Sequence, residues 1–312
     1  MKSLVGYTGF VGSNLDMETA FDGRYNSKNI QEAYGTSPDL LVYAGLPAAK
    51  YLANSAPEKD MAQILNAENN ILKIAPKQLV LISTIDVFKN PVGVYEDTPI
   101  DIKGLAAYGL NRYRLEEWVR EHYAEALIVR LPGLFGKNIK KNFIYDFIHR
   151  IPFMLKEDKM AELSAKEPRL AAYYERQGNG FYRVKLLTAA GEAELKELLE
   201  QVHFSALQFT DSRSIYQFYP LARLWKDIEA ALAHHITLLH LATEPVSAGE
   251  VYQFLTGKSF HNELPGIPAN YDYRTRNTKV FGKVGEGYIL DKGQILQAIL
   301  NFVYDIHRES GQ

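Results

Sequence analysis

Three glycines near the start of the chain have the spacing of a phosphate-binding turn. Gly6, Gly9 and Gly12 follow a short apolar run, and a helix is predicted to open just after them, at Ser13. A strand that turns tightly into a helix directs unpaired backbone N–H groups at one point, where the helix dipole adds partial positive charge. Such a point attracts a diphosphate. The alternative is an ordinary glycine-rich turn without a ligand.

Two hydroxyl groups and one cation follow later in the chain. Thr84 ends an apolar run over 78–84, and Tyr108 opens a long predicted helix over about 107–123. Arg112 comes four residues after Tyr108, so the two side chains share one face of that helix. This pattern can bring a hydroxyl, a phenol and a positive charge to the edge of a sheet. The alternative is that Tyr108 only caps or packs its helix.

The elements that must position these residues alternate between strand and helix. Their predicted ranges are strands at about 24–26, 38–45, 78–84 and 126–131, and helices at about 58–75 and 107–123. The alternation predicts an α/β fold with a doubly wound parallel sheet, the Rossmann architecture. Ligands of such sheets lie at the carboxyl ends of the strands, where Gly6, Gly45, Thr84 and Pro132 fall. The short segment between Gly12 and Tyr43 predicts that one usual strand–helix unit is missing.

The residue composition of the sequence changes after about residue 143. Residues 155–205 are rich in Lys, Glu, Ala and Leu and are predicted to be a helical insertion. We therefore expect a dinucleotide-binding domain over 1–142, to which a segment at about 205–245 returns. Residues 143–312 are expected to form mainly a smaller, mostly helical domain that covers the substrate.

Composition excludes several classes of function. The 312 residues carry a formal net charge of −2 and no long basic run, which argues against a nucleic-acid surface. Cysteine is absent, so disulfides and thiolate chemistry are excluded. No apolar stretch approaches the ~20 residues that cross a bilayer, and we expect a cytoplasmic protein without a membrane partner. His234 and His235 are adjacent and do not share a helix face, so no metal site is expected.

The order of these motifs resembles the extended short-chain dehydrogenase/reductase family, which holds nucleotide-sugar epimerases, dehydratases and reductases. That family's pattern is Gly-x-x-Gly-x-x-Gly, then Ser or Thr at a strand end, then Tyr-x-x-x-Lys on the next long helix. The glycine turn, Thr84 and Tyr108 take these places in order. The segment Ser83-Thr84-Ile85-Asp86-Val87-Phe88 is similar to the dTDP-4-dehydrorhamnose reductase branch. The likeness covers about 1–150 well and 205–255 loosely.

The resemblance implies NADP or NAD as cofactor and a nucleotide sugar, or a similar hydroxyl or ketone compound, as substrate. Tyr108 would be the general acid/base, Thr84 would donate a hydrogen bond to the substrate oxygen, and Arg112 stands where the family has its catalytic Lys. Asp86, Asn142 and Arg213 are expected at the substrate. The expected cofactor-binding residues are Gly6, Thr8, Gly9, Phe10, Val11, Gly12, Ser27, Lys28, Ala44, Gly45, Leu46, Asn66 and Pro132.

Two departures from the family pattern bear on the chemistry. Arg112 supplies a positive charge as Lys does, but its planar head fits a compact pair of ribose hydroxyls less well. No acid follows the second strand, where NAD-preferring relatives bind the ribose hydroxyls. Ser27 and Lys28 stand there instead and favour NADP, unless they belong to an ordinary solvent loop.

Three further polar residues leave alternatives open. Asp86 either joins the site or caps a turn, and Lys50 either reaches the substrate or stays on the surface. Asn66 could support the cofactor from the helix before the Ser-Thr strand, as a helix Asn does in relatives.

The leading hypothesis is an NAD(P)-dependent oxidoreductase or epimerase that works by Tyr-assisted hydride transfer and forms a homodimer, as relatives do. The alternative is a dinucleotide-binding protein of the same fold that has lost catalysis and acts as a sensor or assembly partner.

Overall fold

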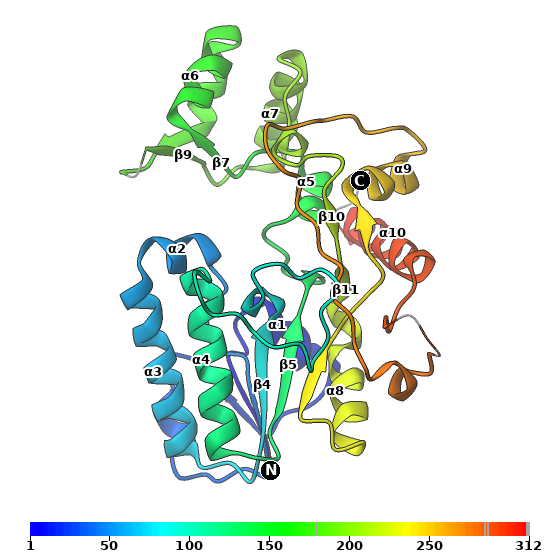
Figure 1. Ribbon diagram of the computed structural model, residues 1–312. Helices are drawn as coiled ribbons and strands as arrows, with labels where there is room; N and C mark the ends of the chain where they lie inside the picture. Colours follow the sequence, from blue (N-terminus) through cyan, green and yellow to red (C-terminus); the bar gives the residue numbers. More distant parts are fainter. Residues whose placement is uncertain (179, 284, 286, 310–312) are drawn as a thin grey trace. The chain divides into compact units, whose positions relative to one another are not determined.

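Six parallel strands form the central sheet of the first compact unit, which comprises Met1–Ile139, Ile215–Val246 and Ala269–Gln312. The computed structural model describes residues 1–178, 180–283, 285 and 287–309 (Figure 1). The strands are β1 (Lys2–Val5), β2 (Gly23–Tyr25), β3 (Leu40–Tyr43), β4 (Gln78–Thr84), β5 (Leu127–Leu131) and β12 (Leu238–His240). Their order is β12-β5-β4-β3-β1-β2, which confirms the predicted doubly wound α/β fold.

The strand register brings the carboxyl ends of four strands to one edge. Val5 of β1 lies opposite Tyr43 of β3, and Thr84 of β4 lies opposite Leu131 of β5. Between α1 (Phe10–Glu18) and β3 the described chain forms only the short strand β2 and a 3₁₀ helix, η1 (Ile30–Ala33). The sheet therefore lacks one strand–helix unit, as the short segment between Gly12 and Tyr43 predicts.

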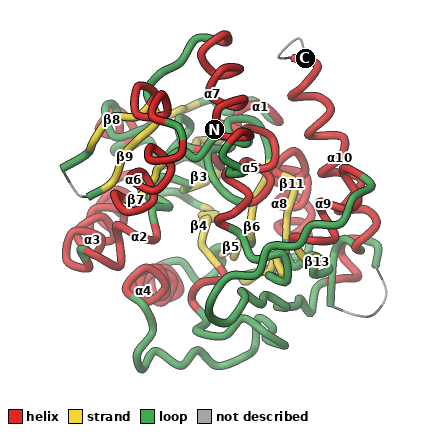
Figure 2. Tube along the Cα trace, turned by 90° about the horizontal axis from the view of Figure 1, so that it is seen from above, coloured by secondary structure: helices red, strands yellow, loops and turns green. Residues whose placement is uncertain are grey.

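Helices cover both faces of this sheet. Viewed from above, α3 (Pro57–Ile74) and α4 (Ala107–His122) lie on one side of the strands, and α1 (Phe10–Glu18) and α8 (Leu224–Ala233) on the other (Figure 2). The short helix α2 (Lys50–Ser55) packs against both α3 and α4. This is the arrangement that right-handed crossovers between parallel strands produce.

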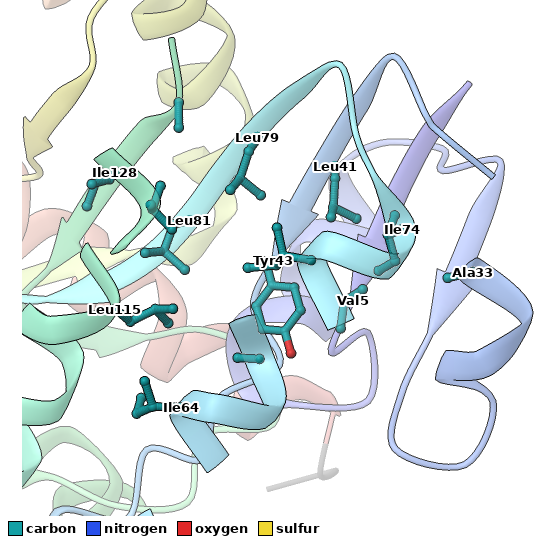
Figure 3. Packing of buried hydrophobic residues seen from close by; sticks show 14 of the residues in the cluster. Val5, Ala33, Leu41, Tyr43, Ile64, Ile74, Leu79, Leu81, Leu115 and Ile128 are labelled. Atoms are coloured by element: carbon teal, nitrogen blue, oxygen red, sulfur yellow. The ribbon is translucent and has the colours of Figure 1, made fainter. Parts of the chain in front are cut away.

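The core between α3, α4 and the sheet is aliphatic. Ile64 and Ile74 of α3 and Leu115 of α4 are fully buried with Leu79 and Leu81 of β4 (Figure 3). Pro57 begins α3 at a position where its missing N–H costs nothing. The buried residues of α3 recur every three or four positions, which is the spacing of one helix face. Each such side chain contributes about 1.5–3 kcal/mol on burial.

The end of the chain returns to the first unit. The remaining elements of the first unit are η2 (Ile85–Val87), β6 (Gly133–Phe135), β10 (Ile215–Tyr216), β11 (Phe218–Pro220), η5 (Leu221–Arg223), η6 (Thr278–Phe281) and α10 (Lys292–Glu309). Phe302 of α10 packs on Phe135, with ring centroids 5.6 Å apart, and Leu290 bridges to Thr243. These contacts place 269–312 in the first unit, whereas the sequence prediction gave this segment to the second domain.

The second unit comprises Lys140–Ser214 and Ser247–Pro268. Its elements are α5 (Phe143–His149), β7 (Met154–Lys156), α6 (Glu157–Lys166), η3 (Pro168–Tyr173), β8 (Tyr174–Arg176), β9 (Phe181–Val184), α7 (Ala189–Gln201), η4 (Ala206–Phe209) and α9 (Ala248–Thr256), with β13 (Val246–Ser247) at its boundary. The helices α6 and α7 lie in the stretch where a helical insertion is expected. Between them, however, lies the antiparallel sheet β7-β9-β8. Tyr182 and Val184 are two residues apart on β9, so they share one face of the strand, and both pack on the core of this unit. Apolar residues at every second position favour a strand.

No helix among the described residues is both long and apolar enough to cross a membrane.

Candidate active site

The glycine turn joins β1 to α1, as predicted, but α1 begins at Phe10 and not at Ser13, so Gly12 lies inside the helix. Gly6 has a φ of +94°, and its N–H donates to the Tyr25 carbonyl over 2.7 Å. A Cβ on Gly6 would lie 2.4 Å from the Ala44 carbonyl oxygen, and one on Gly12 would lie 2.1 Å from the Gly6 carbonyl oxygen. Gly9 is the N-cap of α1, and its N–H donates to the Gly6 carbonyl. Close backbone approach at both positions therefore requires glycine.

Most of the other expected cofactor residues surround this turn. Thr8 lies in the turn itself, and Phe10 and Val11 form the first turn of α1, where backbone N–H groups lack intrahelical acceptors. Ala44, Gly45 and Leu46 follow β3, and the Ala44 N–H donates to the Val5 carbonyl over 2.9 Å.

Two more segments meet the same edge of the sheet. Pro132 follows Leu131, the strand partner of Thr84. Ser27 and Lys28 are exposed in the loop after β2, beside the strand end that binds Gly6.

Thr84 and Tyr108 are brought together at the end of β4. The Thr84 hydroxyl accepts the Asp86 backbone N–H over 3.2 Å, and the Thr84 side chain lies near enough to the Tyr108 phenol to favour its ionised form. Burial raises the pKa of Tyr108, and Arg112 acts in the opposite direction. Gly109 permits the contact because a Cβ there would lie 2.0 Å from the Asp86 carbonyl oxygen. Sequence reasoning missed this glycine, although it directly follows Tyr108.

Arg112 is placed differently from the expected cofactor ligand. Its side chain is 3% exposed, and Nη1 forms an ion pair with Asp60 of α3. Nη2 donates to the Pro47 carbonyl over 2.7 Å, and the guanidinium carbon lies 4.1 Å from the centre of the Tyr108 ring. Arg112 therefore lies beside the phenol, but its donors bind protein groups.

Asp86 and Lys50 form an ion pair next to Thr84, and their roles toward a substrate stay predictions. Lys50 Nζ donates to Asp86 Oδ1 over 2.8 Å, and the Tyr271 phenol is among the groups that favour its charged form. Burial opposes the charge of Lys50, but Asp86 and the neighbouring phenols outweigh it and raise the pKa of Lys50. Tyr271 comes from a distant part of the chain, and no pattern in the sequence indicates it.

A buried polar network supports the strand end from behind. Ser83, the neighbour of Thr84, donates to Glu116 Oε1 over 2.5 Å. Arg130 binds the same carboxylate through Nε and Nη2, at 3.0 and 2.5 Å. Arg130 Nη1 lies 3.2 Å from His240 Nε2, and burial lowers the pKa of His240 to about 4. The network fixes Ser83, the residue that precedes Thr84.

Three expected ligands have other surroundings. Asn66 is exposed, off the buried face of α3, whereas Asn70 is buried and binds the phenols of Tyr34 and Tyr43. Asn142, in the second unit, caps α5 by accepting two backbone N–H groups. Arg213, in the same unit, pairs with Asp211 and Glu263. Their roles toward a cofactor or substrate stay predictions.

The described residues contain no group of three or more His, Asp or Glu side chains that could hold a metal ion.

Among known proteins, solved structures of other proteins are similar to this chain. No model of a protein family and no curated protein matches this chain. The structure of a dTDP-4-dehydrorhamnose reductase from Bacillus anthracis in complex with NADP is similar over 97% of this chain and 98% of its own, with 16% identity and a TM-score of 0.60.

Two other solved structures are similar over the whole chain. A short-chain dehydrogenase/reductase superfamily protein from Agrobacterium tumefaciens with bound NAD has 17% identity and a TM-score of 0.59 over 100% of both chains. A UDP-galactose 4-epimerase has 12% identity and a TM-score of 0.61 over 99% of both. At these identities the likeness confirms the predicted fold.

Proposed function

We propose that this protein is an NAD(P)-dependent oxidoreductase or epimerase of the extended short-chain dehydrogenase/reductase type, with a nucleotide sugar or a similar hydroxyl or ketone compound as substrate. The observation that carries the proposal is the Thr84–Tyr108 hydroxyl pair at the same sheet edge as the glycine turn. The descriptions of the similar solved structures, a reductase, a short-chain dehydrogenase/reductase superfamily protein and an epimerase, support this proposal.

The residues at the glycine turn fit a dinucleotide. Gly6 and Gly12 leave no room for a Cβ, so the backbone can approach a diphosphate closely. The free N–H groups at the start of α1 supply donors for it. Ser27 and Lys28 would hold a 2′-phosphate, which favours NADP. When bound, the nicotinamide takes or gives a hydride.

The side chains at the end of β4 would handle the proton. Tyr108 gives a proton to the substrate oxygen during reduction and takes it back during oxidation. The Asp86 N–H occupies a lone pair of the Thr84 oxygen, so the Thr84 proton is available to an oxygen on the side of Tyr108. Together the two hydroxyls can position an alcohol or a carbonyl at the sheet edge.

The alternative function is dinucleotide binding without catalysis. The ion pair of Arg112 with Asp60 favours it, because the cation at the family's Lys position is bound to the protein. A homodimer in the cytoplasm remains an expectation that light scattering and cell fractionation can measure.

A fluorescence titration with NADPH and NADH tests the proposal. Energy transfer from the protein's aromatic residues to the bound nicotinamide is the readout. We expect micromolar binding, tighter for NADPH, and a Lys28→Ala variant should lose affinity for NADPH but not for NADH. Binding of neither cofactor by the folded protein would refute the proposal.

Turnover then separates the two functions. With a panel of nucleotide sugars, Tyr108→Phe should still bind cofactor but lose activity by about 10²-fold or more. Binding without turnover of any sugar by the wild-type protein would favour the alternative.

A further inference from the structure

A cavity of about 490 Å³ lies within the second unit. It is formed by the end of α5, the last turns of α7 and the segment that joins α7 to η4. All of its described lining residues belong to Lys140–Ser214, whereas Thr84, Tyr108 and the glycine turn belong to the first unit. The volume is within the range of sites for small organic molecules. The proposed function assigns no role to this cavity.

Hydrogen-bond donors predominate among the side chains of the cavity. Its basic residues are Arg150, Lys196 and His203. Glu200 is the one carboxylate among the described lining residues. Gln208, also in the lining, accepts the N–H and the hydroxyl of Ser205 with its amide oxygen, over 2.6 and 2.8 Å, so its amide nitrogen remains as a further donor. A ligand that matches this lining must carry acceptors and negative charge.

Neither permanent cation of the cavity is paired within the protein. The terminal nitrogens of Arg150 form no hydrogen bond or ion pair with any residue that the structure describes. The same holds for the Lys196 ammonium among the described side chains, although Glu192 and Glu200 lie one helical turn away on either side. Both charges are therefore available to a ligand.

The guanidinium of Arg150 is held in place by neighbouring groups. Its Nε donates to the Phe147 carbonyl over 2.7 Å. Its central carbon lies 4.5 Å from the centre of the Phe147 ring and 5.7 Å from that of the Tyr252 ring. These contacts restrict the side chain without using its terminal nitrogens. A fixed guanidinium loses little conformational freedom when it binds the paired oxygens of a phosphate or a carboxylate.

Two of the basic residues occupy backbone conformations that favour glycine. Arg150, the C-cap of α5, has a φ of +62°, and His203, just after the C-cap of α7, has a φ of +53°. Phe204 and His203 donate their N–H groups to the Leu199 and Glu200 carbonyls over 2.9 Å each, a pattern in which glycine usually takes the place of His203. A side chain reduces stability in this conformation, so its presence at both positions points to a use for these side chains.

We propose that this cavity binds a small phosphorylated compound, with the phosphate group at Arg150 and Lys196 and the apolar part on Phe204 and Leu199. Leu199 and Phe204 line the cavity and pack in the core of the unit. Two permanent cations against one carboxylate favour a phosphate, which carries up to two negative charges, over a singly charged carboxylate. The site goes beyond the proposed function, and none of its described residues belongs to the first unit.

Calorimetric titration of the full-length protein with phenyl phosphate and with benzoate tests the inference. Both probes carry one aromatic ring, and only the first carries a phosphate. We expect phenyl phosphate to bind with a dissociation constant of about 1 mM or below, and benzoate to bind at least about threefold more weakly.

Single substitutions assign the binding to the cavity. Arg150→Met keeps an apolar stem but removes the guanidinium, and it should weaken the binding of phenyl phosphate about tenfold or more. Lys196→Gln should weaken it about threefold and Glu200→Gln should strengthen it, because the first removes a positive charge and the second a negative charge. Lys258→Gln, which changes an exposed lysine of the same unit outside the cavity, is the matched control and should leave the affinity unchanged.

One further substitution separates binding from folding. His203→Gly places glycine where the backbone favours it, so the urea midpoint of unfolding, followed by circular dichroism, should stay or rise. The affinity for phenyl phosphate should fall. A lowered midpoint with unchanged affinity would contradict the role of His203 in binding.

Two results would overturn the inference: no saturable binding of phenyl phosphate, or binding that both Arg150→Met and Lys196→Gln leave unchanged. The second result would place the phosphate elsewhere, for example at the glycine turn. Equal affinity for benzoate would overturn the assignment to a phosphate. Because phenyl phosphate carries no nicotinamide, these results are independent of the titrations that decide the proposed function.

Discussion

Replacing Glu116 by Gln should destabilise the first unit by about 3–5 kcal/mol. Glu116 is fully buried and its main partner, Arg130, is 1% exposed. Arg130 makes hydrogen bonds to both carboxylate oxygens, while Ser83 binds one of them. The Gln side chain keeps the shape but removes the negative charge, so a buried guanidinium is left uncompensated. Arg120, which also contacts Glu116, is partly exposed and contributes little.

The double variant Glu116→Leu with Arg130→Met separates the charge effect from packing. When both charges are removed, the loss of stability should be only about 1–2 kcal/mol, because neither ion then remains buried alone. Urea unfolding followed by tryptophan fluorescence is the assay. Trp118 and Trp225 are the two tryptophans of the chain, and both belong to the first unit, so the signal reports on that unit.

The reasoning is refuted by either of two outcomes. One is a loss below about 1 kcal/mol in Glu116→Gln, which would mean that water or rearrangement solvates Arg130. The other is a double variant whose loss of stability equals the sum of the losses in Glu116→Leu alone and in Arg130→Met alone. That result would mean that the pair has no coupling energy.

Two further predictions concern the turn and the buried histidine. In Gly12→Ala the new Cβ would meet the Gly6 carbonyl at 2.1 Å, so nicotinamide binding should be lost and the unfolding midpoint lowered; retained binding would contradict the turn assignment. Burial lowers the pKa of His240 to about 4, below the value of about 6.5 in an unfolded chain. The neutral ring therefore stabilises the fold fully above pH 6.5. Up to about 3 kcal/mol of the free energy of unfolding is lost as the pH falls from 6.5 to 4. Urea unfolding across this range should show a flatter pH dependence in His240→Asn, and identical slopes would contradict the assignment.

The fold follows from local patterns in the sequence. The apolar run at 78–84 predicts β4 with its observed bounds, because a strand buried on both faces needs nearly continuous apolar residues. The helix predicted over 107–123 is α4 to within one residue. The glycine spacing predicts the turn because each backbone contact has a fixed separation along the chain.

The partners of the site residues do not follow from local patterns. Asp60 is 52 residues from Arg112, and Tyr271 is still further from Lys50, so only the tertiary fold brings them together. One signal was available. Asp60 lies on the buried stripe of α3, as Glu116 does on that of α4, and a buried carboxylate requires a cation or several donors. This rule predicts a partner without identifying it.

The first unit is assembled from three separate stretches of the chain, and this affects the order in which it can be made. During synthesis β1–β5 leave the ribosome first, yet β12, at the edge of their sheet, follows a hundred residues later. Phe302, which covers Phe135, comes almost last. The second unit, whose larger stretch is continuous, has its core cluster complete once Phe204 has emerged. A nascent chain that has emerged as far as about residue 210 should therefore hold the core cluster of the smaller unit before Ser247–Pro268 of that unit, and the later stretches of the first unit, have been made.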